Sequence, residues 1–137
     1  MADPKTTKTE IAIVQSFRKA LYYLAPAVRV VAIPNAGKRG LTAIRQAKRE
    51  GLATGFPDVM VLWAGAGIAF IEFKRPGGVV SDNQGEWHQR LDDLGHRVCV
   101  AYGAGQAIKF LISCGAPIDL TETGEETYLG IKLGGAA

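Results

Sequence analysis

Two apolar segments joined by a short turn stand out in the middle of the chain. Residues 55–63 and 67–74 are rich in β-branched and aromatic residues, and only alanine and glycine lie between them, which is typical of a β-hairpin. If the turn is centred on Gly65, the strands fold symmetrically about it, and Asp58 lies directly opposite Glu72 on the same face. A shift of one residue would move Asp58 to the other face, so the predicted register is strict.

The second segment of the hairpin is expected to be a buried strand, because it is apolar on both faces. Successive side chains alternate between the faces, so the strand ends with Glu72 and Lys74 side by side. One face should carry Ile68, Phe70, Glu72 and Lys74, and the other Ala69, Ile71 and Phe73.

Helical spacing and capping signals predict four helices, at about residues 8–24, 42–50, 81–94 and 104–114. Short β-branched segments at residues 28–33 and 97–102 predict two further strands. The order is therefore α-β-(α)-β-β-α-β-α, in a single domain over residues 1–137. For residues 128–133 three alternatives stay open: an edge strand, a dimer contact or partial disorder.

The composition suits a globular protein inside a cell. Hydrophobic residues make up 47% of the 137 residues, and no apolar run approaches the ~18 residues of a membrane span. Residues 1–10 lack the apolar segment of a signal peptide. We therefore expect an intracellular location, no membrane association, and reduced core thiols at Cys99 and Cys114 in preference to a disulfide.

Positive charge is concentrated ahead of the hairpin. The net charge is +3 and the sequence pI is about 9.0, which permits binding to nucleic acid without showing it. A cluster of this kind could bind DNA phosphates or could simply be a solvated face, and the sequence favours neither. The cluster consists of Lys38, Arg39, Arg45, Lys48 and Arg49.

The opposed carboxylates of Asp58 and Glu72 indicate a metal site. At a Cβ separation of about 4.5–5.5 Å they repel each other unless a proton or a metal ion lies between them. Mg²⁺ is usually bound by one or two carboxylates together with waters and substrate phosphates. Lys74 would add a positive charge beside the bound water. The alternative is an ordinary strand with a Glu72–Lys74 salt bridge.

These residues also carry a resemblance to a known family. Pro57-Asp58 followed by Glu72-Phe73-Lys74 resembles the motif of PD-(D/E)XK nucleases, which are similar in fold to restriction endonucleases. With Gly55-Phe56 before it and Ser81 and Gln84 after it, the pattern resembles the VRR-NUC branch, the virus-type replication-repair nucleases. The resemblance covers about residues 8–103 and leaves residues 104–137 as a C-terminal helix and tail. It implies an α/β fold with a mixed four-stranded sheet flanked by helices.

The resemblance also implies a ligand set for Mg²⁺, with Mn²⁺ able to substitute. Asp58, Glu72 and the backbone carbonyl of Phe73 would bind the ion, and Glu10 would reach it through water. Glu10 has a second interpretation, as the end of a capping box that begins at Thr7. In the loop of residues 34–40 the chain has Ala36 where the family often has glycine.

Two further side chains receive roles from the resemblance. Lys74 would orient the attacking water, and Gln84 would hold Lys74 or a water; alternatively, Gln84 caps its helix together with Ser81. His88, one turn further along that helix, is expected to be a satisfied, half-buried histidine rather than a general base.

The function implied is that of a Mg²⁺-dependent, structure-specific DNA endonuclease of the stand-alone, phage-like kind. Its substrate would be branched DNA such as a Holliday junction, cut by a homodimer. A flap nuclease, a non-specific duplex nickase, and a non-catalytic nucleic-acid-binding or assembly module with the same fold are the alternatives.

Overall fold

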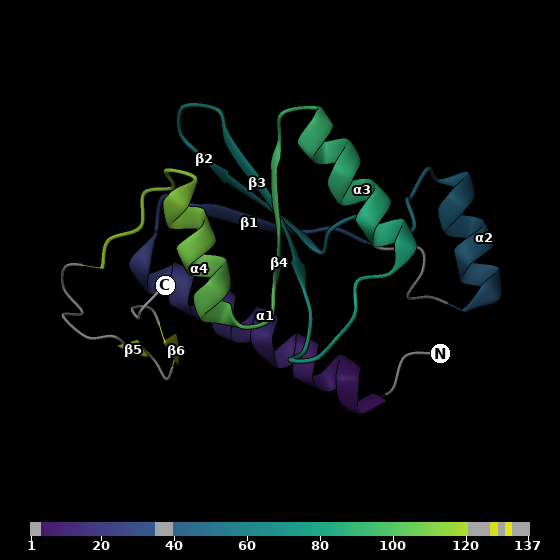
Figure 1. Ribbon diagram of the computed structural model, residues 1–137, viewed down its shortest axis with the longest axis horizontal. Coiled ribbons are helices and arrows are strands. Elements are labelled where there is room, and N and C mark those ends of the chain that lie inside the picture. Colours follow the sequence, from purple (N-terminus) through teal and green to yellow (C-terminus); the bar gives the residue numbers. More distant parts are fainter. Residues whose placement is uncertain (1–3, 35–39, 121–126, 129–130, 133–137) are drawn as a thin grey trace.

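A four-stranded mixed sheet with helices on both faces forms the body of the protein (Figure 1). The computed structural model describes residues 4–34, 40–120, 127–128 and 131–132. The strand order in the sheet is β1-β2-β3-β4. The elements are α1 (Pro4–Leu24), β1 (Arg29–Ala32), α2 (Leu41–Arg49), β2 (Val59–Trp63), β3 (Gly67–Phe73), α3 (Asp82–Asp93), β4 (Arg97–Ala101), α4 (Ala104–Ser113), β5 (Thr127–Tyr128) and β6 (Ile131–Lys132).

The predicted hairpin register is confirmed. Strands β2 and β3 are antiparallel, with Val59 opposite Ile71 and Trp63 opposite Gly67. Continued by one residue, this register places Asp58 opposite Glu72, as the symmetry about Gly65 requires. Strand β1 pairs antiparallel with β2, and β4 pairs parallel with β3, so β3 lies inside the sheet, where its two apolar faces are covered.

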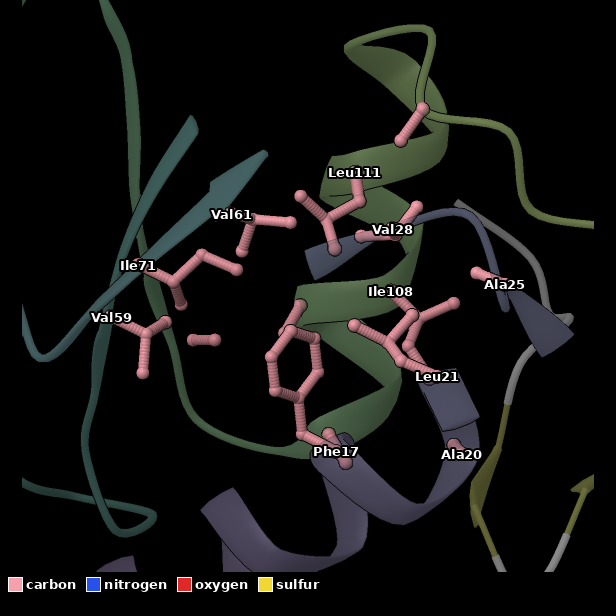
Figure 2. Packing of buried hydrophobic residues seen from close by; sticks show 14 of the residues in the cluster. Phe17, Ala20, Leu21, Ala25, Val28, Val59, Val61, Ile71, Ile108 and Leu111 are labelled. Atoms are coloured by element: carbon pink, nitrogen blue, oxygen red, sulfur yellow. The ribbon is translucent and has the colours of Figure 1, made fainter. Parts of the chain in front are cut away.

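One face of the sheet packs against α1 and α4. The contributing strand residues alternate along the chain, as expected for one face, and include Val59, Val61 and Ile71 (Figure 2). From the helices, Phe17, Ile108 and Leu111 fill the space against them, with no exposed surface. The ring of Phe17 lies 5.1 Å from that of Phe73, which fixes α1 against the end of β3.

The other face of the sheet is covered by α3. Here the ring of Phe56 contacts both Phe70, at 5.6 Å, and Trp87, at 5.0 Å. Because Phe70 and Glu72 are two residues apart on one strand, they point to the same face. The carboxylate of Glu72 therefore lies on the α3 side of the sheet, away from α1 and α4.

One sequence-based detail is wrong. Helix α1 begins at Pro4 rather than at about residue 8, so Thr7 and Glu10 lie within the helix rather than at its start. Proline suits the first turn of a helix because its missing N–H would have no partner there.

Strands β5 and β6 form a separate two-stranded antiparallel sheet, and β6 contacts α4. The described part of the tail is therefore a small hairpin of its own and adds no edge strand to the main sheet. In the described ranges, no helix has the length and apolar character needed to span a bilayer. Both cysteines are free thiols, as expected, and burial together with nearby Cys114 raises the pKa of Cys99 to about 12.

Candidate active site

Asp58 is held at the start of β2 by its neighbours on both sides. Its backbone carbonyl accepts a hydrogen bond of 2.8 Å from the N–H of Ile33, in the extension of β1. Its side-chain Oδ2 accepts one of 2.8 Å from the backbone N–H of Phe73, at the end of β3. The carboxylate is half-buried and is thereby fixed beside the segment that carries Glu72 and Lys74.

Glu72 is a charged side chain with no exposed surface. Burial of a carboxylate is costly unless it is paired and hydrogen-bonded, and Oε1 of Glu72 meets both conditions. Its Oε1 accepts a hydrogen bond of 2.6 Å from Nε2 of Gln84 and lies 3.7 Å from Nζ of Lys74. The Glu72–Lys74 salt bridge therefore exists, but within a larger cluster that includes Gln84 and the opposed Asp58.

The side chain of Gln84 caps its helix and also contacts the cluster. Its Oε1 accepts a hydrogen bond of 2.9 Å from the backbone N–H of Ser81, while the backbone N–H of Gln84 donates to Ser81 Oγ at 3.3 Å. This capping box fixes the amide at the start of α3, so Nε2 points at Glu72. The hydrogen bond goes to Glu72 rather than to Lys74, and Gln84 reaches Lys74 only through the carboxylate between them.

Gly55 brings the segment before Asp58 against α3. Its φ is +88°, and a Cβ built there would lie 2.6 Å from the carbonyl carbon of Asn83 and 2.7 Å from the nitrogen of Gln84. Real Cβ atoms do not approach backbone this closely. Glycine is required here on both counts, and the contact sets the spacing between the Asp58 segment and Gln84. From the sequence, Gly55 could be recognised only as part of a motif, and the physical need for glycine at this position was not visible.

His88 also faces this cluster, one helical turn after Gln84. The ring is half-buried, and its Nε2 is buried without a hydrogen bond to any described residue. Burial and the positive charge of Lys74 lower the pKa of His88, while the negative charge of Asp58 opposes them. The expectation of a satisfied histidine is therefore wrong for Nε2. Sequence reasoning placed the ring on the correct face but could not foresee the missing partner.

Glu10 lies on a different element from the residues of the cluster. It is half-buried on α1, roughly two turns before Phe17, and that helix covers the sheet face opposite to Glu72. A role of Glu10 toward a metal ion therefore stays a prediction.

The basic cluster is only partly within the described chain. Arg45, Lys48 and Arg49 are exposed on α2, which lies at the periphery of the molecule (Figure 1). Ala47 is the buried residue that anchors this helix. Lys38 and Arg39 fall in residues 35–39 and lie outside the described residues.

The donor set fits Mg²⁺ better than a metal that needs many side-chain ligands. The part of the chain with described side chains holds no group of three or more His, Cys, Asp or Glu residues suited to a metal ion. Asp58 and Glu72 do supply two opposed carboxylates, and Mg²⁺ is commonly bound by one or two carboxylates with waters and substrate phosphates. The oxygen-only chemistry of this pair agrees with that mode.

The chain matches a known protein family. Residues 5–105 match the family model of the VRR-NUC domain, and they contain nearly all of α1, the whole four-stranded sheet, α2 and α3. No match was found among curated proteins or among solved structures. A VRR-NUC domain is a nuclease domain of the PD-(D/E)XK type, with DNA as its substrate. The match covers most of the 137 residues, and the chain therefore belongs to the VRR-NUC family.

Proposed function

We propose that the protein is a Mg²⁺-dependent DNA endonuclease that hydrolyses phosphodiester bonds at the cluster of Asp58, Glu72 and Lys74. The observation that carries the proposal is the hairpin register, which brings Asp58 against the end of β3 beside the buried Glu72–Lys74 pair. A non-catalytic DNA-binding module would have no need to bury a charged carboxylate in this way, since burial costs stability.

Asp58, Glu72 and the carbonyl of Phe73 would hold the metal ion. When bound, Mg²⁺ supplies a Lewis acid that neutralises phosphate charge and lowers the pKa of bound water. Gln84 fixes the orientation of the Glu72 carboxylate through its hydrogen bond. Lys74 lies beside that carboxylate and would stabilise the negative charge that develops on the phosphate. Arg45, Lys48 and Arg49 would contact the DNA backbone without reading its sequence.

The first prediction concerns the metal ion. We expect Mg²⁺ and Mn²⁺ to support nicking of supercoiled plasmid, while Ca²⁺ supports binding and little cleavage, because its larger and looser shell positions water poorly. Nicking would be followed on agarose gels, with EDTA as the control. Undiminished nicking in EDTA would remove the metal ion from the mechanism, and binding without nicking in every metal would favour the non-catalytic module.

The second prediction is a homodimer that prefers branched DNA such as a four-way junction. Resolution of a junction needs two symmetric cuts, which a two-fold dimer supplies. Apolar side chains that a second copy could cover lie on α1 and β1: Tyr22 is 75% exposed, Tyr23 58% and Val31 43%. Strand β1 is also an edge of the main sheet, where a partner can pair.

Light scattering should give the mass of two chains, and cleavage of a four-way junction should be faster than that of a matched linear duplex. Val31→Lys, which places a charge on the β1 edge, should weaken the dimer and the junction preference together. A monomer that cleaves both DNAs at the same rate would leave a simple duplex nickase as the function.

The third prediction tests Glu10. Glu10→Gln removes the charge with little change in shape or helix propensity, so the melting temperature should stay within about 2 °C of the wild-type value. If Glu10 reaches the metal ion through water, the Mg²⁺ concentration needed for half-maximal nicking should rise several-fold. An unchanged Mg²⁺ titration would show that Glu10 is an ordinary helix residue and would remove it from the site.

A further inference from the structure

The buried Nε2 of His88 is a polar atom with capacity for a hydrogen bond that no described residue fills. Buried polar atoms in folded proteins almost always have a partner, from the protein or from ordered water. An atom that lacks a protein partner is therefore a place where water or a ligand is expected. On α3, His88 follows Gln84 by four residues, so the two side chains lie on one face, one turn apart.

The surroundings of the ring are those of the nuclease site. Lys74 and Asp58 both act electrostatically on His88, in opposite directions, so the imidazole lies within range of a cation and a carboxylate of the cluster. Burial and the charge of Lys74 lower the pKa of His88, while the charge of Asp58 opposes them. A neutral imidazole has one nitrogen that donates and one that accepts.

This chemistry favours water as the partner of Nε2. Water can donate or accept, so it fits Nε2 in either tautomer, whereas a phosphate oxygen only accepts. A metal ion is a poorer fit, since Lys74 already places a positive charge near the ring. We propose that Nε2 of His88 hydrogen-bonds the water that attacks the scissile phosphate and so fixes its position between Asp58 and Lys74. This inference rests on the proposed nuclease function.

The test compares three variants of the full chain. His88→Leu removes the hydrogen bond and keeps an apolar side chain of similar bulk. His88→Gln restores an amide that can donate or accept near the position of Nε2. His96→Gln is the matched control, because His96 is the other histidine of the chain, is exposed, and has the ring of Phe70 as its contact.

In single-turnover cleavage of a DNA oligonucleotide, His88→Leu should lower the rate constant by about 10²-fold, the loss typical of a misplaced reactant. The DNA concentration for half-maximal rate should change less than twofold. His88→Gln should recover most of the rate, and His96→Gln should match wild type. Two readouts need no cleavage: the melting temperature of metal-free His88→Leu should not fall, and its Mg²⁺ affinity by calorimetry should stay within about twofold.

Several results would overturn the inference. Equal rates for His88→Leu and wild type would show that the ring holds no reacting water. If His88→Leu and His88→Gln lose the same share of the cleavage rate and both melt at lower temperatures, the role of His88 is structural. A tenfold loss of Mg²⁺ affinity in His88→Leu would make it a metal ligand instead. If wild type and His96→Gln fail to cleave DNA in Mg²⁺ or Mn²⁺, the proposed function itself falls, and the inference falls with it.

Discussion

Lys74→Ala is expected to reduce DNA cleavage by about two to four orders of magnitude, the range for loss of a charged group that acts on the transition state. In the structure Nζ of Lys74 lies 3.7 Å from Glu72 Oε1 and is 13% exposed. A cation so placed would stabilise the negative charge that builds up on a phosphate bound beside this cluster. Alanine offers neither the charge nor a hydrogen-bond donor.

The Lys74→Ala change should also lower the stability of the fold, in contrast to Asp58→Asn and Glu72→Gln, which neutralise the carboxylates. Lys74→Ala leaves the buried charge of Glu72 without its counter-ion, at a cost of about 1–3 kcal/mol. Asp58→Asn and Glu72→Gln retain an oxygen that can accept from Phe73 N–H and from Gln84, respectively. They also relieve repulsion between the two carboxylates. These two variants should therefore stay folded while losing cleavage to a similar extent.

Nicking rates and thermal melts of the purified variants would be measured together, at a temperature at which all of them are folded. Lys109→Ala, at an exposed lysine of α4, is the matched control and should retain wild-type nicking. Rapid cleavage by Lys74→Ala would exclude the mechanism, and loss of activity in Lys109→Ala would point to a general effect of lost positive charge on DNA binding.

The hairpin at the centre of the site could be predicted from sequence because its signal is local. A turn of small residues centred on Gly65 and two-residue alternation on either side leave one register compatible with burial of β3. That register, confirmed through Val59 and Ile71, places Asp58 opposite the carboxylate of Glu72. Capping at Ser81 was predictable for the same reason, since a capping box spans one helical turn.

What could not be predicted depends on contacts between distant segments. The hydrogen bond of Gln84 to Glu72 and the unsatisfied Nε2 of His88 follow from the packing of α3 on the sheet. The position of Glu10 follows from the packing of α1 on the opposite face. The true start of α1 at Pro4 was missed because the polar residues before Glu10 show no apolar periodicity.

Gly55→Ala is expected to have the largest effect of any change outside the charged cluster. Alanine at a φ of +88° is strained, and its Cβ would lie 2.6 Å from the Asn83 carbonyl carbon, which cannot move aside like the tip of a flexible side chain. We expect a loss of about 3 kcal/mol or more, from backbone strain combined with overpacking. For a domain of this size the melting temperature should fall by roughly 10 °C.

The loss should extend to activity, although Gly55 carries no functional group. To admit the methyl group, the first turn of α3 must move away from the Asp58 segment, and Gln84 then leaves Glu72. A displacement of about 1 Å in such a site can cost about 10²-fold in rate. Gly51→Ala is the matched control: Gly51 has a similar φ of +85° but nothing within 4 Å of the added Cβ, so it should lose about 1 kcal/mol and keep its nicking rate. If the two variants lose the same stability and both cleave normally well below their melting temperatures, the contact of Gly55 with α3 does not position Gln84.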